Sequence, residues 1–189
     1  MNHLDGENRL VKQFKAGDAS AFEVIMKHYE PYVMGLTLRM IGDRATAEDI
    51  CQEVFVKVLK GLRRFREGST LKTWIFRIAH NTVVDHVRSS KNLEEPLEEP
   101  ENGTKHEATE SSPLNTLAEE QLRLEITKSM KSLQPQVREI VHLFYWDQLS
   151  VGEIGEAMDL PAGTVKTHLF RARKKLRETI EHSAGGIRQ

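Results

Sequence analysis

The densest cluster of residues that could bind another molecule lies near the C-terminus, between Gly163 and Arg177. This stretch contains six Lys or Arg residues and no Asp or Glu. At about 100° per residue, a helix here places one set of side chains on its outer side: Thr164, Thr167, Phe170, Arg171 and Lys174. Such a helix can enter the major groove of DNA, where polar side chains contact base edges and cations contact phosphates. A solvated basic helix is the alternative, because cations near a helix C-terminus also complement the helix dipole.

Two short helices and a bend are needed to position these residues. Ser150 followed by Glu153 is typical of a capping box, which predicts a helix that begins near Val151. This first helix is expected to bury Ile154 and Met158. Residues 159–161 end it, and Pro161 suits the start of a second helix because its missing N–H is not needed there. The second helix is expected to pack on the first through Val165, Leu169, Ala172 and Leu176. The arrangement predicts a helix-turn-helix.

The N-terminal part of the chain contains four stretches with helical periodicity. They predict helices at residues 8–15, at 18–39 with a break or bend near Pro31, at 44–62 and at 70–88. The third helix is expected to begin with a capping pair, Thr46 and Asp49. Its core face is expected to contain Ala47, Ile50, Cys51, Val54, Phe55 and Val58. Its outer face carries Asp49, Gln52, Glu53, Val56 and Lys60, which is either a solvated surface or a protein-docking surface.

A basic loop at residues 61–70 precedes the fourth helix and surrounds an aromatic residue, Phe65. Cations beside an aromatic are typical of a single-stranded nucleic-acid site, in which charge follows the backbone and a base is stacked or held in a pocket. Phe65 could equally be a hydrophobic plug that anchors the loop. The core stripe of the fourth helix is expected to contain Leu71, Trp74, Ile75, Ile78 and Ala79. Its reverse side is expected to carry Thr73, Arg77, Asn81, Val84 and Arg88.

The composition of the whole chain, with 29% charged and 39% hydrophobic residues and a net charge of −1, is that of an ordinary soluble globular protein. Residues 92–118 differ, because they contain seven acids, one Lys and three Pro. Such a segment cannot form a core, which predicts a flexible acidic linker. We therefore expect an all-α protein with two small helical domains, at residues 1–91 and 119–183, followed by a disordered tail at 184–189.

Several functional classes find no support in the sequence. There is neither a phosphate-binding loop ending in GK[ST] nor an HExxH motif, and the eight His residues show no metal-ligand spacing. We therefore predict no catalytic residue, no cofactor and no enzymatic activity. No apolar run reaches the roughly 18 residues of a membrane span, and the N-terminus does not resemble a signal peptide. A cytoplasmic protein without membrane insertion is expected, with Cys51 as a buried thiol.

Three motifs carry a resemblance to a known family. They are AEDICQEVF at residues 47–55, TWIFRIAHN at 73–81 and GTVKTHLFRAR at 163–173. In this order and separation they resemble the extracytoplasmic-function (ECF) sigma factors, group 4 of the sigma-70 family of bacterial RNA polymerase sigma factors. The resemblance implies a transcription-initiation subunit that binds core polymerase, directs it to promoters through the minus-ten and minus-thirty-five elements, and helps to open DNA. A stand-alone helix-turn-helix regulator that binds duplex DNA as a dimer is the alternative function.

The resemblance also implies a role for each group of candidate residues. Those expected to bind the clamp of the polymerase's largest subunit are Asp49, Gln52, Glu53 and Val56. Those expected to contact minus-ten DNA are Phe65, Arg66, Ser69, Lys72, Thr73, Trp74, Arg77 and Asn81. Those expected to contact the minus-thirty-five element are Lys166, Thr167, His168, Phe170, Arg171, Arg173, Lys174 and Lys175. Arg171 is the candidate for a guanine, through two bonds to O6 and N7, whereas His168 is shorter than the cation that relatives often carry there.

Three further expectations concern partners. The resemblance implies that the C-terminal domain contacts the flap of the polymerase and that a separately encoded anti-sigma factor masks the protein. It also leaves two roles for the acidic linker. The linker either passes near the RNA exit path, where its charge imitates nucleic acid, or is a solvated tether.

Overall fold

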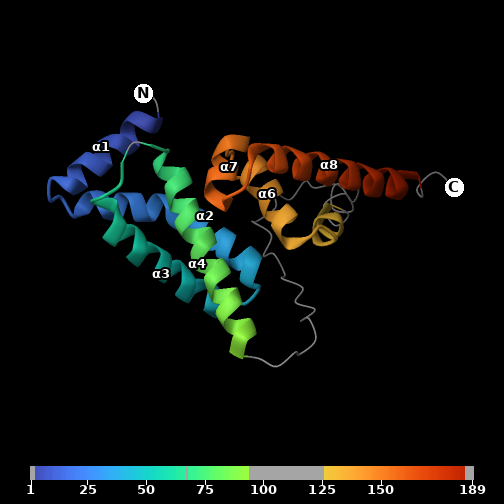
Figure 1. The fold of residues 1–189 in the computed structure, drawn as a ribbon, viewed down its shortest axis with the longest axis horizontal. Helices are drawn as coiled ribbons and strands as arrows, with labels where there is room; N and C mark the ends of the chain where they lie inside the picture. The colour runs from blue at the N-terminus through green and yellow to red at the C-terminus, as the bar shows by residue number, and fades with distance from the viewer. Residues whose placement is uncertain (1–2, 67, 94–125, 186–189) are drawn as a thin grey trace, which may run out of the picture. The chain divides into compact units, whose positions relative to one another are not determined.

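The structure, a computed structural model, describes residues 3–66, 68–93 and 126–185. These residues form helices and connecting turns and contain no strand, so the all-α prediction is confirmed for them (Figure 1). The elements are α1 (His3–Lys15), α2 (Ser20–Ile41), α3 (Arg44–Leu62), α4 (Leu71–Leu93), α6 (Pro135–Tyr145), α7 (Val151–Met158) and α8 (Ala162–Gly185), with further helical residues at 126–131. From residue 94 onward the predicted linker lies outside the described residues, as does most of the predicted tail.

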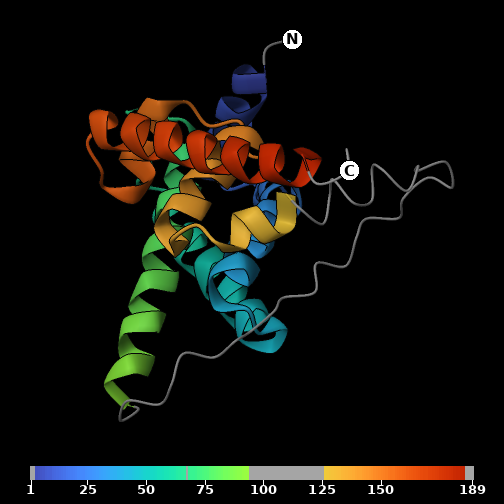
Figure 2. The ribbon, with the colours of Figure 1, turned by 90° about the vertical axis from the view of Figure 1, so that its right-hand side faces the viewer.

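Helices α1 to α4 belong to the N-terminal unit, which also includes residues 152–160. Helices α2, α3 and α4 each pack against the other two, and α1 packs on α2 (Figures 1 and 2). The predicted core face of α3 is confirmed, because all six of its apolar residues are buried. The predicted stripe of α4 is partly wrong, since Phe76 is fully buried whereas Trp74 and Ile78 are only half-buried. The smaller aromatic Phe76, and not the larger Trp74, therefore fills the core beneath α4.

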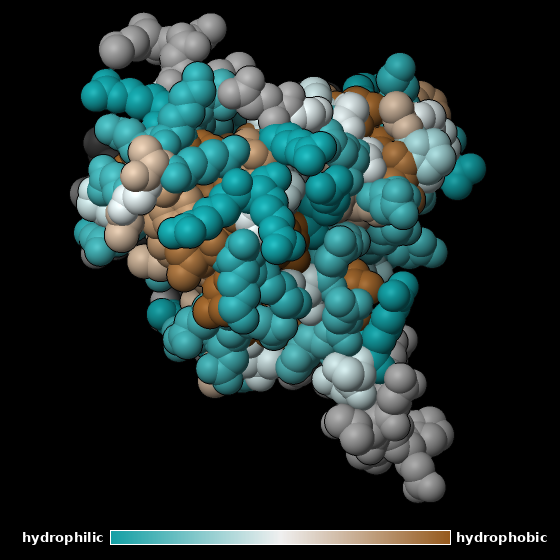
Figure 3. All heavy atoms as spheres, turned by 60° about the vertical axis from the view of Figure 1, so that its left-hand side comes forward, coloured by the Kyte–Doolittle hydropathy of each residue, from teal (hydrophilic) through white to brown (hydrophobic). Residues whose placement is uncertain are grey.

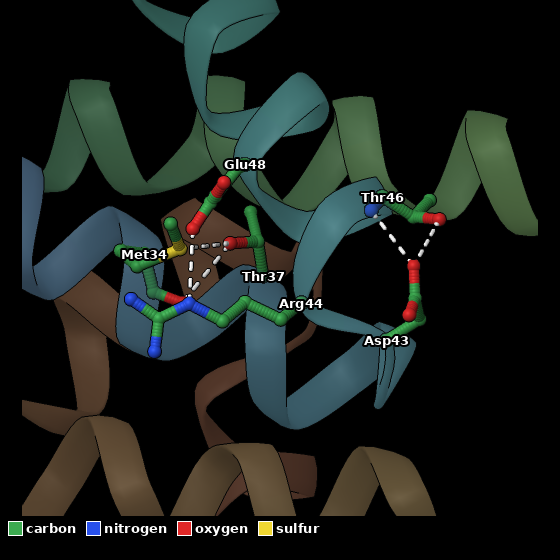
Figure 4. Close-up of polar contacts among 6 residues, drawn as sticks. All are labelled: Met34, Thr37, Asp43, Arg44, Thr46 and Glu48. Atoms are coloured by element: carbon green, nitrogen blue, oxygen red, sulfur yellow. Dashed lines mark hydrogen bonds and ion pairs between the residues drawn. The ribbon is translucent and has the colours of Figure 1, made fainter.

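The start of α3 is fixed by a residue that the sequence analysis did not select. A carboxylate oxygen of Asp43 accepts hydrogen bonds from the Thr46 backbone N–H at 2.8 Å and from the Thr46 hydroxyl at 2.7 Å (Figure 4). Asp43 is thus the N-cap, and the predicted capping pair of Thr46 with Asp49 is wrong. Both hydrogen bonds favour the ionised carboxylate, which lowers the pKa of Asp43 below its ordinary value.

Helix α2 continues through Pro31 as one element, so the predicted break is wrong. A proline inside a helix removes one backbone hydrogen bond, but here packing on three other helices outweighs that loss. One of these contacts is polar, because the buried Tyr29 hydroxyl donates a hydrogen bond to the buried carboxylate of Glu7 in α1. Burial and this hydrogen bond both raise the pKa of Tyr29. Helix α1 begins at His3, five residues before its predicted start at residue 8.

Helices α6 and α8 pack against each other in the C-terminal unit. The guanidinium of Arg138 in α6 donates to the backbone carbonyls of Met130, Lys131 and Leu133 at 2.8 to 3.1 Å. Met130 and Lys131 end the helical stretch, where carbonyls lack intrahelical partners, and Leu133 lies in the bend that follows. Arg138 therefore fixes the helical residues 126–131 onto the unit.

The two helices predicted around the bend are present as α7 and α8. Helix α7 begins at Val151 as predicted, and its Ile154 and Met158 side chains are buried. It ends in a left-handed residue, Asp159 (φ +54°), after which the Leu160 N–H donates to the Gly155 carbonyl at 2.8 Å. An aspartate tolerates this conformation better than most residues with a Cβ. The sequence-predicted helix-turn-helix elements are therefore formed at the expected residues.

Candidate nucleic-acid interface

Four of the five side chains predicted for the outer side of α8 are exposed, namely Thr167, Phe170, Arg171 and Lys174, whereas Thr164 is half-buried and Lys166, predicted on the flank, is exposed. Lys166, Thr167, Phe170, Arg171 and Lys174 are all exposed, whereas Val165, Leu169 and Ala172 on the opposite side are buried. Phe170 stands out because 67% of its surface is accessible. An exposed aromatic ring beside cations can contact the methyl group of a thymine while the cations contact guanine or phosphate. We define these five exposed residues as the α8 face.

Two predicted DNA contacts on α8 are directed elsewhere. The Lys175 ammonium donates to the Ser132 carbonyl at 2.6 Å, and the Arg173 Nε donates to the Leu169 carbonyl at 3.3 Å. Both residues are exposed but lie on the flanks of the helix, and His168 is half-buried. The structure thus brings the α8 face together and leaves these three residues beside it.

A groove of roughly 710 Å³ lies within the C-terminal unit and was not predicted from the sequence. Its walls are mainly apolar and come from residues 126–130, the end of α6 and the second half of α8. Tyr145 and Trp146 border it, with 48% and 56% of their surfaces accessible. Two adjacent aromatic residues at the end of a helix are the sequence signal that could have indicated a binding surface here, since exposed apolar patches often mark such surfaces. We call this the C-terminal groove, lined by Ile126, Met130, Val141, Tyr145, Trp146, Arg173, Leu176, Arg177 and Glu181.

The outer face of α3 is exposed as predicted. Asp49, Gln52, Glu53 and Val56 are all accessible to solvent, and Val56 retains 47% of its accessible surface. The Glu53 carboxylate forms an ion pair with Lys57 at 2.8 Å. Because this pair is half-exposed, it contributes little to stability. The acids on this side of α3 are Asp49, Glu53 and the nearby Glu48. We call Asp49, Gln52, Glu53 and Val56 the α3 face.

A second unpredicted groove, of about 540 Å³, runs along α2 and α3 beside the α3 face. Gln52 and Val56 belong to both surfaces, and the groove is lined further by Met26, Met34 and Leu59 among others. Arg44 and Glu48 form an ion pair at 3.0 Å on its rim (Figure 4). The space-filling view in Figure 3 shows apolar surface among polar residues on one side of the molecule.

Cys51 lies at this groove but is 95% buried, since only 5% of its surface is accessible. Burial, with a smaller contribution from the charge of Glu30, raises the pKa of its thiol to about 11. A thiol of that pKa is almost entirely protonated near neutral pH and is a poor nucleophile. The predicted buried thiol is confirmed.

The loop before α4 forms the rim of a pocket together with the first turns of that helix. Phe65 is 94% buried, with 6% of its surface accessible, and its ring packs on Trp74 at a centroid distance of 5.1 Å. Of the two alternatives for Phe65, the structure therefore favours the hydrophobic plug. The pocket beside this ring pair is lined by Gly61, Arg64, Phe65, Arg66, Gly68, Ser69, Trp74, Arg77 and Glu156, and the carboxylate of Glu156 lies 3.9 Å from the Arg77 guanidinium. We call it the loop pocket.

Gly61 explains how Trp74 reaches its position. A methyl group on residue 61 would lie 2.9 Å from Cζ2 of the Trp74 ring, closer than carbon atoms approach without strain. The last turn of α3 must therefore lack a side chain here so that the indole can lie across it. By contrast, a methyl group on Gly68 would meet no atom within 4 Å.

The remaining candidate residues of α4 do not line the loop pocket. The Lys72 ammonium lies over the ring of Tyr32 in α2, 5.7 Å from its centroid. Thr73 is buried, and its hydroxyl is 2.7 Å from the hydroxyl of Thr70. Asn81 is exposed one turn beyond Arg77. Of the eight residues predicted for this site, five meet at the pocket, namely Phe65, Arg66, Ser69, Trp74 and Arg77.

The part of the chain that the structure describes has no group of three or more His, Cys, Asp or Glu side chains that could hold a metal ion. Within the same residues, no helix is long and apolar enough to cross a membrane. The surfaces described above are one cationic helix face, one acidic helix face, two grooves and the loop pocket.

Comparison with known families matches both units. Residues 25–92 match Sigma-70 region 2, and residues 123–176 match Sigma-70 region 4. The first match spans most of α2, all of α3 and all but the last residue of α4. The second spans residues 126–131, α6, α7 and most of α8. Together they contain every residue of the α3 face, the α8 face and the loop pocket.

Individual relatives extend the similarity over nearly the whole chain. The ECF RNA polymerase sigma factor SigW of Bacillus subtilis is 32% identical over 176 residues, which cover 90% of this chain and 94% of the relative. The ECF RNA polymerase sigma-E factor of Escherichia coli K12 is 32% identical over 180 residues, covering 91% and 93%. The sigma factor RpoE from Bartonella quintana, solved in complex with the anti-sigma factor NepR, has the same fold. Its TM-score is 0.62 at 19% identity, with 85% of this chain and 96% of that chain covered.

Proposed function

This chain belongs to the ECF sigma factors of the sigma-70 family, and we propose that each of its binding surfaces serves a separate part of promoter recognition. A sigma factor directs core RNA polymerase to promoter DNA, and that is the function of this protein. The family initiates transcription without catalysing a reaction of its own. We accordingly assign no enzymatic activity to this chain, and we assign it to the cytoplasm, where RNA polymerase acts.

The α8 face is the proposed reader of the minus-thirty-five element. Its early polar residues, Lys166 and Thr167, are placed to meet base edges as the helix enters the major groove. Arg171 can donate two hydrogen bonds to one guanine, and Phe170 can pack on a neighbouring thymine methyl group. Lys174 lies further along the same face and is the proposed phosphate contact.

The loop pocket is the proposed site that captures a base of the minus-ten element. Taking a base out of the stack costs a few kcal/mol, which binding in the pocket must offset. Arg66 and Arg77 can follow the phosphates of the displaced strand, while Ser69 and the half-buried Trp74 form a mixed polar and aromatic wall. Phe65 supports Trp74 from behind, so we assign it a structural role. Lys72, Thr73 and Asn81 are then secondary candidates.

The α3 face is the proposed contact with the clamp of the polymerase. Its exposed acids offer charge complementarity to a basic surface, and the exposed Val56 offers apolar contact. The adjacent apolar groove enlarges this surface, since it contains Gln52 and Val56 as well. A helix face with an apolar centre and a charged rim has the composition of a protein-binding site.

The C-terminal groove is the proposed contact with the polymerase flap. Its exposed aromatics, Tyr145 and Trp146, are the residue types that most often anchor protein interfaces. We also propose a separately encoded anti-sigma factor as a regulator, supported by the complex that the Bartonella quintana relative forms with its anti-sigma factor. Such a partner inhibits transcription if it covers the α3 face or the α8 face.

The observation that carries the proposed function is the pairing of one exposed acidic helix face with one exposed cationic helix face in the two matched regions. The test is transcription with purified core polymerase on a promoter selected by the holoenzyme from a randomised library. Run-off RNA from that promoter is expected only when both core and this protein are present. The assignment fails if this protein alone footprints a palindromic duplex while no promoter-specific RNA appears.

A further inference from the structure

We propose that Lys15, the last residue of α1, is a positioning residue for the loop pocket, an inference that rests on the proposed minus-ten function of that pocket. The Lys15 ammonium donates a hydrogen bond to the backbone carbonyl of Phe65 at 2.5 Å. The two residues are 50 positions apart in the chain, so the bond joins α1 to the loop at residues 63–70. A hydrogen bond from a charged donor is stronger than one between neutral groups.

The hydrogen bond from Lys15 holds the loop at Phe65, a residue whose side chain is also packed in place. The ring of Phe65 packs on Trp74, while its carbonyl accepts the proton from Lys15. The neighbouring residues Arg64 and Arg66 both line the loop pocket. Because a peptide unit is planar, the orientation of the Phe65 carbonyl constrains the direction in which Arg66 leaves the backbone. Lys15 therefore acts on the pocket through the backbone and without touching it.

Helix α1 is a firm base for such a contact. The buried Val11 and Phe14 seat it on the unit, and the Phe14 ring lies 5.9 Å from the ring of Phe22 in α2. The hydrogen bond from Tyr29 to Glu7 adds a buried polar link near the other end. After Lys15 the chain reverses through Gly17 (φ +103°), where the Asp18 N–H donates to the Gln13 carbonyl at 3.1 Å. Both ends of α1 are thus tied to the unit.

The consequence is a loop whose shape is set before DNA arrives. Ordering a mobile loop upon binding consumes part of the binding free energy, and base capture already has to offset the cost of unstacking. Removal of the Lys15 bond therefore weakens capture of the minus-ten strand. It leaves the α3 face and the α8 face unchanged, since neither contains a residue in contact with Lys15.

The test compares Lys15→Met with Lys12→Met in the reconstituted holoenzyme. Lys12 is the other basic residue in the last turn of α1 and is exposed, so the two variants lose the same charge at the same helix end. The measured quantities are the affinity for a single-stranded minus-ten oligonucleotide and the rate of promoter opening, followed by 2-aminopurine fluorescence. We expect Lys15→Met to lower both about five- to tenfold, as for loss of a part-buried charged hydrogen bond, whereas Lys12→Met changes neither.

Two further readouts separate positioning from general damage. Lys15→Arg can still donate to the carbonyl and should retain most of the wild-type oligonucleotide affinity and opening rate. Both Lys15 variants should match the wild type in affinity for polymerase and in melting temperature. Discrimination between oligonucleotides with the preferred and a substituted minus-ten base should also fall in Lys15→Met. Two results would overturn the inference, because each would mean that Lys15 acts only as a cation. One is an equal defect in Lys15→Met and Lys12→Met. The other is a lower salt dependence of oligonucleotide affinity in the Lys15 variant alone.

Failure of this inference can be distinguished from failure of the proposed pocket. If Lys15→Met opens promoters normally while Arg66→Ala and Arg77→Ala do not, Lys15 is not a positioning residue but the minus-ten assignment stands. If all three variants open promoters normally, the minus-ten assignment fails, and the inference fails with it.

Discussion

The α8 face and the loop pocket are both proposed to contact DNA, yet they differ in how many elements of the fold form them. The α8 face consists of five exposed side chains of one helix, held in place by a single buried stripe. The loop pocket combines the end of α3, a loop, the start of α4 and Glu156 of α7, and its shape depends on the Phe65 and Trp74 rings and on the small size of Gly61. A helix face follows from local periodicity, whereas a pocket depends on contacts between distant residues.

The α3 face belongs with the α8 face in this comparison, because it is also displayed by one helix. The two differ in charge, with acids on α3 and cations on α8. In the roles proposed for them, the same geometry serves a protein partner where its charge is negative and a nucleic acid where its charge is positive. Four sets of variants test this contrast, and they are ordered from the largest expected effect to the smallest.

The strongest effect is expected from reversing the charge of the α3 face. The double variant Asp49→Lys with Glu53→Lys should weaken binding to core polymerase more than about a hundredfold, because like charges opposed across an interface cost several kcal/mol. The measurement is the affinity for fluorescently labelled core. The matched control reverses two other exposed acids of the same unit, Glu23 and Asp85, and should bind core as the wild type does. Normal binding by the first variant would remove the α3 face from the proposed interface.

A smaller and base-specific effect is expected from Arg171→Ala. Loss of a bidentate guanine contact costs about 1 to 3 kcal/mol at one base pair, and binding to core polymerase should not change. The measurement is run-off transcription on a set of promoters that each carry one substitution in the upstream element. The variant should lose its preference at a single position. A uniform loss across all promoters would instead identify Arg171 as a phosphate contact.

The loop pocket should respond to a substitution at Gly61, the glycine in its wall that lets the Trp74 ring lie across α3. Gly61→Ala forces the Trp74 ring to move, and such overpacking costs about 1 kcal/mol or more, so promoter opening should fall about fivefold. Gly6→Ala adds the same methyl group to open space in α1, outside the loop pocket, and should leave opening unchanged. Circular dichroism should show equal helix content in both. If the two variants open promoters equally well, the position of Trp74 does not matter for DNA.

The mildest effect is expected from Lys174→Ala. Lys174 pairs weakly with Glu178 at 3.8 Å on the exposed helix surface, so its charge is available to a phosphate. Removal should weaken binding of the holoenzyme to all promoters alike and lower the slope of log affinity against log salt by about 1. A loss confined to one base pair would place Lys174 among the base-reading residues instead.

The sequence by itself determined the features that depend on neighbouring residues along the chain. The bounds of α3 agree with those predicted, and α7 begins where its predicted capping residue places it. The exposed members of the α3 and α8 faces and the buried Cys51 follow from helical periodicity, since about 100° of rotation per residue fixes which side chains share a side. The family resemblance came from the same short motifs.

Tertiary structure decided the features that join residues far apart. It joined α1 to α2 through the bond from Tyr29 to Glu7, carried α2 through Pro31, buried Phe76 in place of Trp74, and turned Lys72 toward Tyr32. It also produced the two grooves, the choice of Phe65 as a plug and the bond from Lys15. The physical reason is that periodicity fixes the direction of a side chain from its own helix. What the side chain meets in that direction depends on packing against elements that are distant in sequence.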